Sequence, residues 1–299
     1  MMAMRTATAA RGELLLNEPM ARHTSWRVGG PADRFYLPAD IEDLSRFLES
    51  QPPDAPLYWI GLGSNLLVRD GGVRGTVIAT AGLLNGLDVV GEGLVRAEAG
   101  VASAKVARFS VERGLTGAEF LAGIPGAVGG ALAMNAGCHG GETWRIVQAV
   151  ETMDRRGARR TRPPADYRIG YRTVAGPADE WFVAAHFRLN HGSVAQGREL
   201  IKALLAKRGA SQPTQLPNAG SVFKNPPGDH AARLIEAAGL KGACEGGACV
   251  SALHANFIVN TGGATAAAIE RLIARVQAEV EKRHGVKLEP EVRVIGEKI

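Results

Sequence analysis

Apolar residues recur with two periods along the chain, and these predict both helices and strands. Helical spacing follows Asp40 at Ile41, Leu44, Phe47 and Leu48, and follows Thr265 at Ile269, Leu272, Ile273, Val276 and Val280. Further helices are predicted at 102–113, 198–207 and 231–238. Strands are predicted at 23–31 (running into a turn), within 66–72 (a short strand and a turn), and at 57–60, 76–80, 95–99, 147–153, 181–189, 256–260 and 291–295. The pattern therefore predicts helices and strands mixed along the whole chain.

A glycine-rich segment at 117–141 interrupts the periodic pattern. Its eight glycines favour backbone that takes positive φ or lies close to a ligand, and Pro125 argues against a continuous helix. Interleaved apolar residues such as Phe120, Leu121 and Ile124 need burial, which argues against disorder. We predict a long ordered loop that binds a pyrophosphate or runs along a flat cofactor ring.

A second glycine-containing loop, Gly61-Leu62-Gly63-Ser64-Asn65, follows the predicted strand at 57–60. A dinucleotide-binding Rossmann unit requires a third glycine and an amphipathic helix after such a loop. Here the next residues, 66–72, predict a short strand and a turn. The Rossmann interpretation therefore fails on its context.

Composition excludes several function classes. A length of 299 residues favours two domains, although one large α/β domain is possible, and the polar segment 191–197 is the best boundary between two domains. The net charge of +5 suits an anionic substrate but is too small for a nucleic-acid-binding protein, and the arginine run 155–162 predicts a solvated hairpin with its turn near Gly157. No apolar run reaches membrane-spanning length, and the cluster Leu14–Leu16 is too short for a signal peptide, so we expect a cytoplasmic protein.

The three cysteines, Cys138, Cys244 and Cys249, match no metal-ligand spacing. The last two could suggest zinc together with His254, but no second cysteine pair is present. We therefore expect reduced thiols without a chemical role and no metal.

Three motifs could carry chemistry. Ser221 follows a glycine on a loop and precedes Lys224, which suits a proton donor beside an anion-binding group, although a turn serine is the more common case. The sequence Tyr167–Arg172 holds two Tyr-Arg pairs that suit a carboxylate or phosphate, or form a plain surface strand. Glu289 and Glu291 lead into the last strand and could equally be solvated.

Seven motifs in this order resemble the UDP-N-acetylenolpyruvoylglucosamine reductase (MurB) family, from about Leu16 to Gly296. They are HTSWRVGGPA, GLGSNLLVRD, GAEFLAGIPGAVGGALAMNAG, DYRIGYR, NAGSVFKNP, HANFIVN and EPEVRVIG. The resemblance implies an FAD-binding domain of the vanillyl-alcohol-oxidase (PCMH) type at 16–194 and a smaller α+β substrate-binding domain at 195–299.

The resemblance also implies site residues. Those around the FAD pyrophosphate would be Gly61, Gly63, Ser64, Asn65 and Leu66, and those along the flavin would be Gly123, Ile124, Pro125, Gly126 and Gly129. Substrate contacts would come from Tyr171, Lys224 and Asn225.

The implied reaction uses NADPH to reduce the flavin, after which the enolpyruvyl sugar nucleotide takes a hydride at its terminal carbon. Arg172 and Glu291 would stabilise the enolate that develops, Glu291 only if it carries or shares a proton. Ser221 would then deliver a proton to the neighbouring carbon.

One feature separates the chain from a longer subgroup of the family, in which an insertion after FKNP carries a tyrosine that closes over the nucleotide. Here only residues 227–230 separate FKNP from the next helix, so the chain resembles the shorter subgroup. We also expect a monomer or weak oligomer. Two alternatives remain open: another FAD oxidoreductase on the same fold, and a basic nucleotide-binding protein without enzymatic activity.

Overall fold

The computed structural model describes residues 11–299, and the chain divides into two compact units. Unit 1 combines residues up to Leu16 with Arg34–Leu62 and Gly75–Lys207. Unit 2 combines Asn17–Asp33, Gly63–Arg74 and Arg208–Ile299. Two segments from the first quarter of the chain therefore belong to the unit that holds the C-terminus. The functional boundary between 194 and 195 stays a prediction.

The first sheet of unit 1 has four strands, three of which run on into segments of unit 2. Their order is β1-β2-β5-β3, with β1 at Glu13–Pro19, β2 at Pro31–Leu37, β3 at Leu57–Ile60 and β5 at Val73–Ala79. Helix α1 (Ile41–Glu49) packs the predicted apolar face against Tyr36 and Ile78. Asp40 caps it by accepting from the Asp43 N–H at 2.8 Å, as predicted.

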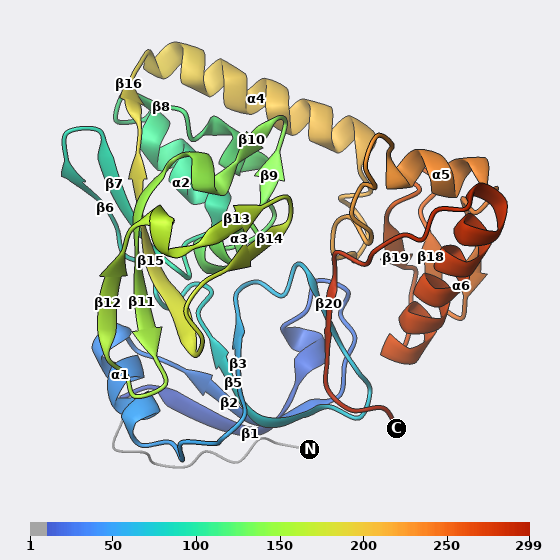
Figure 1. The fold of residues 1–299 in the computed structure, drawn as a ribbon, viewed down its shortest axis with the longest axis horizontal. Coiled ribbons are helices and arrows are strands. Elements are labelled where there is room, and N and C mark those ends of the chain that lie inside the picture. The colour runs from blue at the N-terminus through green and yellow to red at the C-terminus, as the bar shows by residue number, and fades with distance from the viewer. Residues whose placement is uncertain (1–10) are drawn as a thin grey trace. The chain divides into compact units, whose positions relative to one another are not determined.

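The second sheet of unit 1 is antiparallel and has five strands (Figure 1). Their order is β12-β11-β15-β7-β6, with β6 at Leu87–Gly91, β7 at Leu94–Glu98, β11 at Val147–Asp154, β12 at Arg159–Arg162 and β15 at Glu180–Arg188. The predicted arginine hairpin is confirmed as β11 and β12, with Gly157 at a φ of 79° in its turn.

A partly buried ion cluster lies on this sheet. The Arg96 guanidinium donates to both carboxylate oxygens of Glu151, at 2.6 and 2.9 Å, and Glu151 also contacts His186 Nε2 at 2.8 Å and Arg159 Nη2 at 3.2 Å. The hydrogen bonds from Arg96 lower the pKa of Glu151 to about 2, although its burial acts in the opposite direction.

The remaining elements of unit 1 are short. They are α2 (Ser103–Val111), α3 (Val128–Ala133), η2 (Glu119–Gly123), η3 (Thr143–Arg145), η4 (Pro164–Asp166), β8 (Leu115–Thr116), β9 (Gly137–Cys138), β10 (Gly141–Glu142), β13 (Arg168–Gly170), β14 (Thr173–Ala175) and β16 (Asn190–His191). The prediction of one long loop over 117–141 is wrong, because α3 and η2 form there. Burial of Val128, Leu132 and Leu121 in the core stabilises these turns despite the glycines.

Helix α4 (Val194–Ser211) carries the chain into the main part of unit 2. That unit contains η1 (Met20–Arg22), the parallel pair β4 (Leu66–Val68) and β20 (Arg293–Ile295), the antiparallel sheet β17 (Cys244–Glu245), β18 (Ala248–Val250) and β19 (Ile258–Asn260), and helices α5 (Ala231–Ala237) and α6 (Ala266–His284). No helix within 11–299 is both long and apolar enough to cross a membrane.

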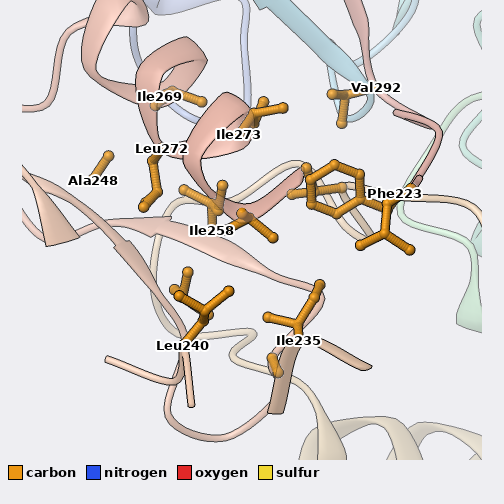
Figure 2. Close-up of a cluster of buried hydrophobic side chains, with 14 of the residues drawn as sticks. Phe223, Ile235, Leu240, Ala248, Ile258, Ile269, Leu272, Ile273 and Val292 are labelled. Carbon is orange, nitrogen blue, oxygen red and sulfur yellow. The ribbon is translucent and has the colours of Figure 1, made fainter. Parts of the chain in front are cut away.

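The core of unit 2 lies between α5, α6 and the β17-β18-β19 sheet (Figures 1 and 2). Thr265 caps α6, and all five predicted face residues of that helix are buried. Phe223 and Val292 point into the same cluster as Leu272 and Ile258, as Figure 2 shows. Burial of Phe223 and Val292 therefore holds the neighbouring backbone of both segments in place.

The predicted strand at 23–31 is wrong. Residues 23–30 form an irregular segment, with Arg27 at a φ of 59°. Trp26 is fully buried in the unit 2 core and donates its Nε1–H to the Ile258 carbonyl oxygen at 2.7 Å. A contact with a distant part of the chain therefore overrides the local β preference.

The expectation of reduced thiols is also wrong for two of the cysteines. Cys244 and Cys249 form a disulfide, whereas Cys138 keeps its thiol. The two lie directly opposite each other in the β17-β18 hairpin, with their Cα atoms 4.1 Å apart. Their turn, Gly246-Gly247, is typical of tight hairpins, so the pairing follows from local structure.

Candidate functional site

Both predicted cofactor loops meet in unit 1. A Cβ atom placed on Gly61 would lie 3.3 Å from the Cβ of Ala127, which follows Gly126 in the second loop. The second loop is held by backbone hydrogen bonds, because Gly129 N–H donates to Ala99 and Ser103 N–H donates to Gly126, each at 2.9 Å. A Cβ on Gly129 would lie 3.0 Å from that of Ala99, so close backbone approach explains this glycine.

The first loop continues into unit 2, where residues 23–25 pack against Gly63. The N–H and Oγ of Ser25 donate to the Gly63 carbonyl oxygen at 3.2 and 3.3 Å. Gly63 has a φ of 61°, and a Cβ there would lie 2.0 Å from the His23 carbonyl oxygen. Only glycine fits this position. Strand β4 begins at Leu66, which confirms that no helix follows the loop.

The chemistry of both loops fits FAD. In the second loop the N–H groups of Ile124, Val128 and Gly129 already donate to carbonyl oxygens of the protein. Residues 61–66 and 123–129 contain no carboxylate, and the first loop carries the Ser64 hydroxyl and the Asn65 amide. Such donors suit a pyrophosphate. Ile124 is buried, Pro125 is exposed, and Gly123 closes η2 against Cys138, whose Sγ would lie 2.5 Å from a Cβ.

Arg172 occupies the two-residue turn between β13 and β14 in unit 1. Its φ of 53° lies in the left-handed region, where a non-glycine residue is strained. Its Nη2 donates to the Gly137 carbonyl oxygen at 2.9 Å, and the Asn135 amide donates to Gly170 at 3.1 Å. The hairpin therefore holds the guanidinium beside the glycine-rich segment. Tyr171, the other turn residue, is half exposed.

Ser221 lies in unit 2 on a loop that begins with a turn. Gly220 has a φ of 73°, and its N–H donates to Asn218 Oδ1 at 2.9 Å. Ser221 itself is partly exposed, whereas the next two residues are buried. The loop therefore presents one hydroxyl at the surface of a rigid segment.

The buried Asn256 holds this segment in place, a role that the sequence did not reveal. Its carbonyl oxygen accepts from Val222 N–H at 2.9 Å, its Oδ1 accepts from Phe223 N–H at 3.0 Å, and its Nδ2 donates to the Phe223 carbonyl oxygen at 2.8 Å. The motif HANFIVN was the available signal, but it gave no indication of the partner. A buried amide that is hydrogen-bonded through both Oδ1 and Nδ2 fixes the backbone beside Ser221.

Glu291 lies beside the serine loop. Its N–H donates to the Val222 carbonyl oxygen at 2.7 Å, and the flanking Lys224 N–H donates to Glu289 at 2.9 Å. Strand β20 then runs parallel to β4, with Arg293 opposite Leu66. Because both strands begin at the same end of this pair, Glu291 lies next to the end of the first cofactor loop.

The other predicted substrate contacts are also in unit 2. Lys224 Nζ lies 3.4 Å from Glu289 Oε2, an exposed pair. Asn225 accepts from Ala231 N–H through Oδ1 at 3.0 Å, at the start of α5, so at least its oxygen has a structural partner. Unit 2 thus brings together Ser221, Glu291 and Asn65, while unit 1 brings Arg172 to the second glycine loop. The site roles of these residues stay predictions.

Two family models match the chain. One is described as an FAD binding domain and matches residues 32–161. The other is described as the C-terminal domain of UDP-N-acetylenolpyruvoylglucosamine reductase and matches residues 212–295.

Similar proteins cover nearly the whole chain. The UDP-N-acetylenolpyruvoylglucosamine reductase of Methylococcus capsulatus is 60% identical over 295 residues, which cover 99% of this chain and 97% of the relative. That of Alkalilimnicola ehrlichii is 61% identical over 286 residues, 96% of each. Among solved structures, UDP-N-acetylenolpyruvylglucosamine reductase (MurB) from Thermus caldophilus is 35% identical with a TM-score of 0.82, covering 95% of this chain and 99% of that one.

Proposed function

The chain belongs to the family of UDP-N-acetylenolpyruvoylglucosamine reductases, which are FAD oxidoreductases of peptidoglycan precursor synthesis, and from this premise we propose which residues bind the cofactor and which catalyse the reaction. The substrate is the enolpyruvyl ether of UDP-N-acetylglucosamine, and the product carries a lactyl ether. One observation supports the assignment most strongly: the Glu291 backbone is hydrogen-bonded to the residue after Ser221, beside the strand that follows the first cofactor loop.

The two glycine loops would hold FAD. Gly61, Gly63, Ser64, Asn65 and Leu66 would surround the pyrophosphate, and residues 123–126 with Gly129 would line the flavin. The chemistry that FAD supplies when bound is hydride transfer, from NADPH to the terminal carbon of the enolpyruvyl group.

Arg172 and Glu291 would stabilise the negative charge that develops on the substrate as an enolate. The left-handed turn and the hydrogen bond to Gly137 preorganise the Arg172 guanidinium, whose planar fork suits both an enolate and a carboxylate oxygen. Glu291 contributes as a hydrogen-bond donor, which requires a proton on its carboxyl group.

Ser221 would donate a proton to the carbon next to the one that receives the hydride. The new C–H bond then takes the electron pair of the enolate, and the serine oxygen regains its proton from solvent. Anchoring of Phe223 in the core and of Val222 by Asn256 limits the motion of the hydroxyl, which favours general acid catalysis.

Several finer properties belong to the same proposal. The protein acts in the cytoplasm as a monomer or weak oligomer. It follows the shorter subgroup pattern, because four residues separate FKNP from α5. Tyr171, Lys224 and Asn225 contact the sugar nucleotide.

The test uses the purified protein, which should be yellow and should release FAD rather than FMN on denaturation. NADPH oxidation is then followed with and without UDP-N-acetylglucosamine enolpyruvate. Turnover that depends on the enolpyruvyl substrate is expected. A folded protein that cannot be loaded with FAD, or one that ignores this substrate, would contradict the proposal.

A further inference from the structure

We propose that Asn65 is a positioning residue that couples occupancy of the first cofactor loop to the placement of Glu291. The inference rests on the role proposed above for Glu291. It adds a function that the sequence did not assign to Asn65, which was predicted only as a contact of the pyrophosphate.

Asn65 contacts the chain around Glu291 at two points. Its side-chain Nδ2 donates to the Glu291 carbonyl oxygen at 3.1 Å, and its own carbonyl oxygen accepts from Arg293 N–H at 3.0 Å. The second bond continues the β4-β20 pairing, which opens with Leu66 opposite Arg293. The first bond is made by the side chain alone, and an apolar residue of the same size cannot make it.

The backbone of Glu291 is thereby held from two sides. Its N–H donates to Val222, next to the proposed proton donor, and its carbonyl oxygen accepts from Asn65 in the cofactor loop. When the peptide groups on both sides of a residue are hydrogen-bonded, its backbone has little freedom to move. The Cα atom from which the Glu291 carboxyl group extends is therefore held in place. Of the two hydrogen bonds that restrain Glu291, Asn65 makes the one that comes from the cofactor loop.

The loop is also where an anionic ligand would bind. Ser64 and Asn65 are adjacent, and Gly63 is fixed by Ser25 and His23. A ligand that restricts 64–65 therefore restricts the peptide that Asn65 holds. By thermodynamic linkage, the coupling free energy is the same whether it is measured on FAD binding or on ordering of the chain around Glu291. FAD binding therefore orders this part of the chain.

The experiment compares Asn65→Leu, Glu291→Gln and the double variant, each loaded with FAD. Asn85→Leu is the matched control, because the Asn85 amide also donates to a backbone carbonyl, that of Gly82 at 3.1 Å, on an exposed loop. Flavin reduction by NADPH and re-oxidation by the enolpyruvyl substrate are measured separately. If the leucine variant does not retain FAD, Asn65→Ser serves instead, since its side chain is too short to make the same contact.

In FAD-loaded Asn65→Leu we expect the ratio of the re-oxidation rate to the reduction rate to fall by about 10- to 100-fold relative to the parent. The double variant should be no slower than Glu291→Gln, because Asn65 acts through that residue. Additive losses would overturn the proposal. Normal re-oxidation in Glu291→Gln would refute the role of Glu291 instead. The coupling between the cofactor loop and the Glu291 backbone would then be decided by hydrogen exchange.

The second measurement is amide hydrogen exchange over 289–295, without and with FAD. In the parent and in Asn85→Leu, FAD should slow exchange in this segment by about threefold or more, and in Asn65→Leu this slowing should disappear. Equal protection by FAD in all three proteins would overturn the coupling, whatever the role of Glu291.

Discussion

Glu291 donates its backbone N–H to the carbonyl oxygen of Val222 at 2.7 Å, so the acid near the C-terminus and the residue after Ser221 are hydrogen-bonded neighbours. Phe223 and Val292, the next buried residues on each segment, lie in one core cluster (Figure 2). Two proposed catalytic groups therefore sit on backbone that the hydrophobic core fixes, which is where precise chemistry requires them.

Arg172→Lys should reduce turnover by about 100-fold or more, because a lysine ammonium cannot reproduce a planar fork against an enolate and a carboxylate. The FAD content should stay close to that of the parent. Arg168→Lys, at the exposed first residue of β13, is the control and should have near-normal turnover. Steady-state turnover and flavin absorbance check both. Near-normal turnover in Arg172→Lys would remove this residue from the site.

Glu151→Gln should destabilise the protein by about 2–4 kcal/mol, because it breaks a partly buried ion pair with Arg96. The pKa of Glu151 is lowered to about 2 by the Arg96 hydrogen bonds. Its stabilising contribution is therefore complete above the unfolded-state pKa and is lost as the pH falls from about 4.5 towards 2.

Urea unfolding at several pH values measures this effect. The parent should lose stability over that range, and Glu151→Gln should lose less. Glu49→Gln, at an exposed helix end, should behave like the parent. A glutamine variant with the stability and acid sensitivity of the parent would show that the cluster contributes nothing.

Cys244→Ser combined with Cys249→Ser should lower the free energy of unfolding by about 2 kcal/mol, the effect expected of a disulfide that closes a short loop. Turnover should be unchanged, because this hairpin supplies no proposed site residue. Thiol titration of the unreduced, unfolded parent should find one thiol, that of Cys138. Three thiols in the absence of reductant would exclude the disulfide.

The sequence predicted those parts of the fold that have local causes. Thr265 and Asp40 mark the starts of α6 and α1 because their side chains cap the first turns, and the apolar period identifies the buried faces. It could not predict that residues 17–33 and 63–74 join unit 2. That grouping depends on contacts such as Trp26 with Ile258 and Leu66 with Arg293, which leave no local pattern.

The candidate site shows the same division. Motif order predicted Ser221, Arg172 and Glu291 as site residues, but it did not indicate the hydrogen bonds that Asn256 and Asn65 make to the backbone near Ser221 and Glu291. Asn256 makes two side-chain hydrogen bonds to the backbone of Phe223, and Asn65 makes one to the backbone of Glu291. Asparagine on a loop is too common to indicate such a distant partner. The disulfide was missed for a different reason, because a protein expected in the cytoplasm is expected to keep its thiols reduced.

Ser221→Ala tests the central claim most directly, because it separates the two half-reactions. Reduction of the flavin by NADPH should proceed close to the parent rate, since the hydroxyl has no part in that step. Re-oxidation by the enolpyruvyl substrate should slow by about 10²–10⁴-fold, the usual contribution of a positioned general acid. Ser193→Ala, at an exposed serine before α4, should leave both rates unchanged. Slow reduction with normal re-oxidation, or parent rates for both steps, would contradict the role of Ser221 as proton donor.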